Sequence, residues 1–284
     1  MSKQYGRRWR VTLFPEGNGE AITIDNSLRV SFDCEKSISD KPNQAKVMIY
    51  NLSLSNIDKA LNGDFKRVVL SVGYQSLNQL FIVDITKATV KRADVDFVLV
   101  LDCADGFAAY KNGRIKISLE RGATDKDIIK NLTETFPGVQ LGQMEIPNLR
   151  KLPRGRVLNG DTREILNKIA NNSQADWCIQ DNEFIFLPKN KVLKNQAVVL
   201  SQESGMIGSP ERTDDGLELN CLLNTELKIG GLVQVKSIIK SFNGFYKIVK
   251  VKHTGDSHSN DWKSQLTVVA VNYTAVKETG ASNG

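Results

Sequence analysis

The spacing of apolar residues changes twice along the chain, and this change constrains the fold more than any single motif. In residues 6–119 apolar and polar residues alternate, as in Leu28, Val30 and Phe32, which is the period of a strand with one buried face. In residues 120–196 apolar residues recur every three to four positions, the period of amphipathic helices. From residue 197 to 276 the two-residue period returns. The sequence therefore predicts a mainly β protein with an α+β insertion.

The 284 residues are enough for two or three domains. Closely spaced strands with turn residues between them are typical of sandwiches and barrels. We expect two similar β-barrel domains flanking a small α+β module. The predicted parts are a first barrel (1–119), a middle module (120–196), a second barrel (197–276) and a flexible polar tail (277–284).

Cap and turn residues locate the helices and one hairpin. Ser55 is a suitable N-cap for a short helix, and Thr124 with Asp127 resembles a capping box. Ile165, Leu166, Ile169 and Ala170 mark the inward face of a third helix. The predicted helices span 55–62, 124–136 and 161–173, and the hairpin turns at Asp181–Asn182.

The two β-rich segments repeat each other weakly. Residues 49–52 lead through a Gly-containing spacer to 68–72, and residues 221–224 lead in the same way to 232–235. Phe81–Val83 and Tyr246–Ile248 follow, and the last strands open with Asp96–Phe97 and Asp261–Trp262. An internal duplication and chance similarity between β modules both explain this pattern.

Two histidines, His253 and His258, flank a polar loop with Asp256 and Asp261 nearby. These residue types could hold a metal ion, but their spacing matches no standard zinc signature. Asp, Ser, Asn and Gly are also the ordinary residues of a hairpin tip, which is the interpretation we favour. Whether an ion binds near these histidines stays open.

Asp102, Cys103 and Asp105 follow a predicted strand, where paired carboxylates could do acid–base work. We favour strand-end turn chemistry, because no histidine or further carboxylate stands at a predictable distance. No GxSxG, Walker A, GxGxxG or HExxH segment occurs. We assign no catalytic, cofactor-binding or metal residue. The four cysteines are expected to be small buried residues without disulfides: Cys34, Cys103, Cys178 and Cys221.

The chain carries 38 basic and 32 acidic residues, a mild excess that identifies no nucleic-acid binder. Its basic cluster is expected to be a solvated strand edge, with a phosphate-contacting arm as the alternative: Lys3, Arg7, Arg8 and Arg10. Trp9, Trp177 and Trp262 are expected to pack in cores or interfaces. No apolar run is long enough to cross a membrane, so we expect no membrane insertion and a cytoplasmic protein unless it leaves within a larger assembly.

Taken in order, several segments resemble baseplate hub proteins of contractile-tailed phages and prophages. Each segment alone is weak, and their order along nearly the whole chain carries the resemblance. The segments are Arg7–Val11, Phe32–Ser37, Asn43–Ser53, Val72–Tyr74 with Leu80–Phe81, Gly205–Thr213, Cys221–Asn224 and Val249–Trp262.

The resemblance implies a structural virion component of the tail baseplate that is not an enzyme and has no cofactor. Three subunits with two similar barrels each would form a trimeric ring of pseudo-sixfold symmetry. Such a ring would join the sixfold tail tube protein to the threefold central spike protein. The tape measure protein and other baseplate proteins are further candidate partners, and assembly would take place in the host cytoplasm.

Three alternatives stay open at this point. Phage tail tips often carry a cell-wall hydrolase, which would need convergent carboxylates in a cleft. A related contractile injection or secretion system uses the same hub architecture. A β-barrel face could also bind nucleic acid or carbohydrate, which would require a basic stripe interleaved with aromatic residues.

Overall fold

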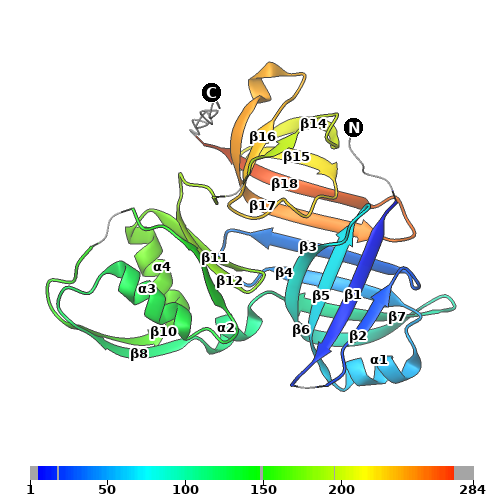
Figure 1. The fold of residues 1–284 in the computed structure, drawn as a ribbon, viewed down its shortest axis with the longest axis horizontal. Helices are drawn as coiled ribbons and strands as arrows, with labels where there is room; N and C mark the ends of the chain where they lie inside the picture. Colours follow the sequence, from blue (N-terminus) through cyan, green and yellow to red (C-terminus); the bar gives the residue numbers. More distant parts are fainter. Residues whose placement is uncertain (1–5, 18, 148–149, 195, 272–284) are drawn as a thin grey trace, which may run out of the picture.

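A computed structural model describes residues 6–17, 19–147, 150–194 and 196–271 of the chain. The predicted tail (277–284) and Lys3 lie outside these residues. Figure 1 shows three parts, which we call the N-terminal β unit (β1–β7 with α1), the middle module (α2–β12) and the C-terminal β unit (β13–β18). The protein is mainly β with an α+β insertion, as predicted.

The N-terminal β unit has the strand order β3-β4-β7-β6-β5-β1-β2, antiparallel throughout. Its strands curl around one core that includes Val11, Val47 and Leu99 (Figure 1). No ladder among the described residues joins β2 to β3, so the unit is an open barrel. Its elements are β1 (Arg8–Pro15), β2 (Ile22–Asp25), β3 (Val30–Ser37), β4 (Gln44–Tyr50), α1 (Leu54–Leu61), β5 (Phe65–Gly73), β6 (Asn78–Ala93) and β7 (Asp96–Ala104).

The middle module packs helices α3 and α4 with two small sheets around a second core. Thr124 and Asp127 form the predicted capping box of α3, and Asp161 caps α4 by accepting hydrogen bonds from the backbone of Arg163 and Glu164. The elements are α2 (Phe107–Asn112), β8 (Arg114–Leu119), α3 (Asp125–Glu134), β9 (Gln140–Met144), β10 (Arg156–Asp161), α4 (Thr162–Asn172), β11 (Ala175–Gln180) and β12 (Glu183–Pro188).

The β11–β12 hairpin is buried on both faces. Its turn, Asp181–Asn182, has φ values of 54° and 65°, the left-handed conformation that two-residue hairpin turns need. Trp177 and Phe184 point into the core of the middle module, whereas Cys178 and Ile185 point into that of the C-terminal β unit. Because side chains alternate along a strand, this one hairpin joins two cores.

The C-terminal β unit has the order β14-β15-β18-β17-β16-β13. Its core includes Leu219, Val233 and Leu266. The elements are β13 (Val198–Leu200), β14 (Met206–Thr213), β15 (Gly216–Leu222), β16 (Leu232–Val235), a 3-10 turn (Lys240–Phe242), β17 (Gly244–Asp256) and β18 (Trp262–Ala270).

The two β units share the order of five strands and most of their register, although β14 is irregular between Ile207 and Glu211 where β3 is regular. The order β3-β4-β7-β6-β5 in the N-terminal β unit corresponds strand by strand to the order β14-β15-β18-β17-β16 in the C-terminal β unit. Ile49 faces Leu99 across β4 and β7, and Cys221 faces Ser264 across β15 and β18. These pairs keep the predicted offsets, so the structure confirms that the weak sequence repeat reflects two similar units.

A bulge occupies the same place in both units. The β6–β7 register shifts between Ile85 and Lys87, and the β17–β18 register shifts between Ile248 and Lys250. Bulges depend on local pairing geometry, so one at equivalent positions is a specific sign of similar architecture. The units differ at their far edge, where β1 pairs antiparallel with β5 but β13 pairs parallel with β16.

Several details differ from the sequence analysis. Ser53, not Ser55, is the N-cap of α1, because the chain already turns helical at Leu54. In β6 and β17, Val83 corresponds to Tyr246, two residues away from the match that the sequence suggested.

Strand β8 belongs elsewhere than expected, and α2 was not expected at all. Strand β8 pairs with β10, and its Ile115 lies in the core of the middle module, although residues up to 119 were expected in the first barrel. Six-residue α2 is too short to show a helical period. We propose residue 104 as the end of the first barrel.

Candidate assembly surfaces

The two β units are joined into one sheet, since residues 250–256 of β17 pair with residues 31–37 of β3 (Figure 1). We call this pairing the β17–β3 joint. Two ion pairs cross its outer face, Lys250 with Glu35 and Lys252 with Asp33, each with an N–O distance of 2.9 Å. Sheet edges pair readily because each presents unpaired N–H and C=O groups. The β17–β3 joint therefore shows that two units of this kind can join by pairing strands at their sheet edges.

One end of the joint is held by an arginine. Arg29 contacts the Asp256 carboxylate through two hydrogen bonds of 3.2 and 2.7 Å, and its guanidinium lies 4.4 Å from the centre of the Tyr50 ring. Burial works to raise the pKa of Asp256, but hydrogen bonds from Arg29 and from the His258 backbone hold it below its usual value. A bidentate pair of this kind fixes direction as well as distance.

The inner face of the joint is tightly packed around Gly255. Trp262, only 2% exposed, meets the Phe32 ring edge-on at 5.5 Å between centroids. A Cβ atom on Gly255 would lie 2.3 Å from Phe32 Cζ, so a side chain cannot fit there without displacing the ring. Trp262 and Leu223 of the C-terminal β unit belong to the core of the N-terminal β unit.

A buried polar cluster fixes the middle module against the N-terminal β unit. Lys36, 3% exposed, donates to both carboxylate oxygens of Asp181 at 2.8 and 2.9 Å and to the Leu80 carbonyl oxygen at 3.1 Å. The backbone N–H of Asp181 donates to Asp105 at 2.8 Å. Burial raises the pKa of Asp105 to about 7, while Lys36 works to lower it. Burial also works to lower the pKa of Lys36, but Asp181 holds it above its usual value.

A second buried lysine fixes the middle module against the C-terminal β unit. Lys247, 1% exposed, lies 3.5 Å from an Asp176 carboxylate oxygen and donates to the Lys189 carbonyl oxygen at 3.2 Å. Burial lowers the pKa of Lys247. Gln180 accepts a hydrogen bond from the Ile229 backbone at 2.9 Å. Polar groups buried in pairs demand specific geometry, so the hairpin sets how the two β units meet.

The structure separates the residues considered for metal binding. His253 is buried in β17 with Nδ1 2.8 Å from Ser264 Oγ, and burial lowers its pKa to about 3. His258 is exposed in the loop, and Asp256 is occupied by Arg29. Within the described ranges, no three His, Cys, Asp or Glu side chains are grouped to hold a metal.

The carboxylates after β7 also have distinct places. Asp102 is paired with Lys46 at 3.4 Å on the surface, whereas Asp105 is completely buried in the polar cluster. Asp105 lies in the turn that follows β7, as expected, but its burial and its contact with Asp181 were revealed by no local pattern. The cysteines are all buried and free, as predicted.

The N-terminal basic cluster was expected at a strand edge, but Arg8 and Arg10 lie in β1, which pairs with β5 on one side and β2 on the other. Its described residues have specific partners. Arg7 donates to the Ser259 carbonyl oxygen at 2.6 Å and lies 5.6 Å from the centre of the Trp262 ring. Arg10 is 3.9 Å from Asp25. Trp9, Trp177 and Trp262 are all buried in cores, as predicted.

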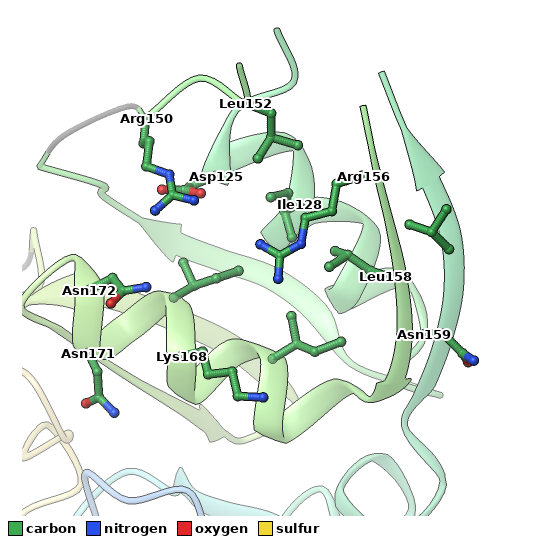
Figure 2. A pocket seen from close by; sticks show the side chains of 13 residues that line it. Asp125, Ile128, Arg150, Leu152, Arg156, Leu158, Asn159, Lys168, Asn171 and Asn172 are labelled. Atoms are coloured by element: carbon green, nitrogen blue, oxygen red, sulfur yellow. The ribbon is translucent and has the colours of Figure 1, made fainter. Parts of the chain in front are cut away.

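A pocket of about 530 Å³ lies on the middle module between α3, α4 and β10. Figure 2 shows Arg150, Arg156 and Lys168 around it, with Asp125 beside Arg150. Its base is apolar, including Ile128. Three cations beside one carboxylate suit an acidic segment of a partner better than they suit acid–base chemistry. Among the residues that the structure describes, no helix combines the length and apolarity needed to cross a membrane.

Solved structures with this fold include phage tail proteins and a type VI secretion component. A tail protein from Neisseria meningitidis MC58 superposes with a TM-score of 0.62 at 11% identity, covering 93% of this chain and 96% of its own. The 43 kDa tail protein of prophage MuSo2 from Shewanella oneidensis gives 0.62 at 9% identity, covering 92% and 96%. The E. coli c3393 protein, a type VI secretion component similar in structure to T4 tail proteins gp27 and gp5, gives 0.59 at 8% identity, covering 87% and 74%.

The fold is therefore that of these phage tail proteins and of this type VI secretion component. The profile of the baseplate hub gp41 family matches residues 9–268, nearly the whole chain, and the protein belongs to that family. Among curated protein sequences, none matches the chain. A baseplate hub is a structural component of the phage tail, and that is the role of this protein.

Proposed function

We propose that three copies of this chain form a ring of pseudo-sixfold symmetry that connects the sixfold tail tube to a threefold central spike. The observation that carries the proposal is the repeated unit: one chain holds two β units that share the order of five strands and a bulge at the same place. Three such chains present six similar units. One face of the ring can then match a hexagonal partner while the ring itself keeps threefold symmetry.

The middle module would break the sixfold equivalence. It occurs once per chain, and the hairpin β11–β12 ties it to both β units through Lys36 and Lys247. A threefold partner such as a spike could therefore distinguish three positions on a ring that otherwise has six. The tape measure protein and other baseplate proteins remain candidate neighbours, and assembly would precede release from the host cytoplasm.

The proposal assigns no catalytic step to the chain. A cell-wall hydrolase would need carboxylates that converge in an open cleft, whereas Asp105 is buried and Asp102 is held by Lys46. Incubating the purified protein with peptidoglycan tests this alternative. Release of soluble fragments, absent in an Asp105→Asn/Asp102→Asn variant that still folds, would favour the hydrolase.

Counting copies tests the ring directly. Native mass measurement and imaging of isolated tail particles should show three copies around an open channel. One copy or six copies per baseplate would contradict the proposal. The related secretion-machine role, which the likeness to the c3393 protein favours, predicts particles without a DNA-filled head.

A further inference from the structure

The two β units are equivalent, yet one edge is paired and its counterpart is not. We call residues 250–256 the β17 edge and residues 87–93 the β6 edge; they follow the same bulge in equivalent strands. The β17 edge pairs with β3, but no strand of the described chain pairs with the outer side of the β6 edge. Helix α1 lies against β6 without pairing with it as a strand, and packs its Ile57 and Ala60 into the core of the same unit.

Burial at matched positions reflects this difference. Val251 and His253 are 0% and 2% exposed under the β17–β3 joint. Their counterparts on the β6 edge, Ala88 and Val90, are only half-buried. Because the units share one architecture, the missing burial corresponds to a missing neighbouring strand.

The aromatic residues that open β7 and β18 show the same contrast. The backbone N–H of Asn51 donates to the Phe97 carbonyl oxygen, as that of Leu223 donates to the Trp262 carbonyl oxygen, so Phe97 and Trp262 are equivalent. Trp262 is 2% exposed because Phe32 covers it across the joint, whereas Phe97 is 42% exposed. Val95, beside Phe97, is 83% exposed.

Strand β14 is the counterpart of β3, and its side chains are less buried than those of β3. Residues 31–36 of β3 include the buried Phe32, Cys34 and Lys36. In β14 the side chains of residues 207–209 and 211–213 are exposed, and Ile207 is 45% exposed. Strand β14 is also the terminal strand of the sheet on this side.

We propose that the β6 edge of one copy pairs antiparallel with β14 of a second copy, as β17 pairs with β3 within each chain. The partner is therefore another molecule of this same protein, and the inference rests on the proposed ring. Transferring the register of the β17–β3 joint through the equivalent strands places Lys91 opposite Glu211 and Ala93 opposite Ile207. Between these two pairs β14 holds two more residues than β3, because its own register is irregular between Ile207 and Glu211, so the proposed ladder includes a bulge there.

Charge and size fit this pairing. Lysines on β17 face acids on β3 in the joint, and Lys91 faces Glu211 in the proposed contact. In the joint Gly255 leaves room for the Phe32 ring. On the β6 edge the equivalent position holds Arg92, and the facing stretch of β14 is Gly208, Ser209 and Pro210, none of which carries a long side chain.

The proposed pairing also allows several copies to close into a ring. Each copy offers one β6 edge and one β14, so the contact joins different surfaces of neighbouring copies. Such a head-to-tail contact closes into a ring when the rotation per copy divides a full turn. Alternating the joint with the proposed contact would run one sheet through all six units of a three-copy ring.

Disulfide trapping in assembled particles tests the register. Lys91→Cys with Glu211→Cys should give a covalent trimer on oxidation, because facing Cβ atoms in an antiparallel pair are about 4.5–5.5 Å apart. Lys91→Cys with Glu218→Cys is the matched control, since Glu218 lies one strand further in on β15. The native cysteines are buried and should not interfere.

The outcomes separate the pairing from the ring. A covalent trimer from the first variant and none from the control supports the pairing. Particles with three copies but no cross-link overturn the pairing and leave the ring intact. Particles with another number of copies overturn both.

Charge reversal tests the same contact without cysteines. Lys91→Glu and Glu211→Lys should each reduce assembled particles at least tenfold, and the double variant should restore them. Lys130→Glu on α3, an exposed lysine of the middle module, should assemble normally. Normal assembly of both single variants would overturn the pairing, as would a double variant no better than either single one.

Discussion

The β17 edge and the β6 edge are the same piece of architecture in two settings. The first lies inside a continuous sheet, beneath Trp262 and beside β3, whereas the second lies at a boundary of the described molecule. Their sequences reflect these settings: Gly255 stands where the Phe32 ring fits, and Arg92 stands where no strand of the described chain pairs with β6. Equivalent units can therefore carry different residues, because one edge is covered by a strand of the same chain and the other is not.

Truncating the two equivalent aromatic residues should give the largest contrast. Trp262→Ala should lower the free energy of unfolding by about 3–5 kcal/mol, because it removes a fully buried ring. Phe97→Ala should cost about 1 kcal/mol in the isolated chain, since that ring is 42% exposed. Urea denaturation measures both. Equal losses would contradict the difference between the paired and unpaired edges.

Breaking the buried Lys36–Asp181 pair should be the next largest effect. Asp181→Asn keeps a residue that tolerates the left-handed turn but leaves the lysine charge without its partner, at a cost of about 3 kcal/mol. The double variant Lys36→Met/Asp181→Asn removes both charges and should recover most of the loss. A double variant no more stable than the single one would show that shape, not charge, holds the hairpin in place.

A smaller contrast is expected at Gly255 and Arg92, which occupy equivalent positions. Gly255→Ala should destabilise the chain by about 1–3 kcal/mol, because its Cβ would overlap the Phe32 ring. Arg92→Ala should change the free energy of unfolding by less than about 0.5 kcal/mol, since this side chain is exposed. Thermal melts of both variants provide the measurement, and a neutral Gly255→Ala would mean that the joint is looser than the structure shows.

Asp105 predicts a dependence on pH. Its pKa is about 7 in the folded chain and lower when unfolded, so the folded state holds an extra proton between about pH 4 and 7. The contribution of Asp105 to stability therefore falls as pH rises through this range. Asp105→Asn should remove that loss and be on the order of 1 kcal/mol more favourable, relative to the unmodified chain, at pH 8 than at pH 4.

The difference between variant and unmodified protein is what isolates Asp105. His253 works in the opposite direction, because its pKa of about 3 makes the folded chain bind fewer protons than the unfolded chain below about pH 6.5. Parallel curves of stability against pH for the two proteins would show that Asp105 does not titrate in this range.

The ion pairs on the outer face of the joint should have the smallest effect. Lys252 and Asp33 are each more than one third exposed, so a double-mutant cycle should give a coupling of about 0.2–1 kcal/mol. Added salt should weaken it. A coupling of several kcal/mol would indicate that these charges, and not the packing around Gly255, decide the joint.

Local patterns in the sequence predicted the local structure well. Helices α3 and α4 start at Thr124 and Asp161 side chains that satisfy free backbone N–H groups, and such caps need only nearby residues. The Asp181–Asn182 turn could be predicted for the same reason. The short α2 and the placement of β8 were missed, because a six-residue helix has no period and an alternating strand does not reveal its partner.

The buried contacts between parts could not be read in this way. Lys36, Asp105 and Asp181 are far apart in the chain, and lysine or aspartate in an alternating segment ordinarily indicates an exposed position. Only the hairpin β11–β12, inserted between two cores, brings these charges together and removes them from water.

The order of the parts follows from local sequence patterns: strands, then helices with a hairpin, then strands again, with a repeat between the first and last. Apolar period, caps and turns depend on residues close together in the chain, so a short stretch of sequence is enough to recognise them. The pairing of β17 with β3, the burial of two lysines, and the lack of a described partner strand for the β6 edge and for the outer side of β14 arise only when distant parts of the chain pack together. Those outcomes depend on which distant surfaces meet, and a pattern along one strand carries no information about the strand beside it.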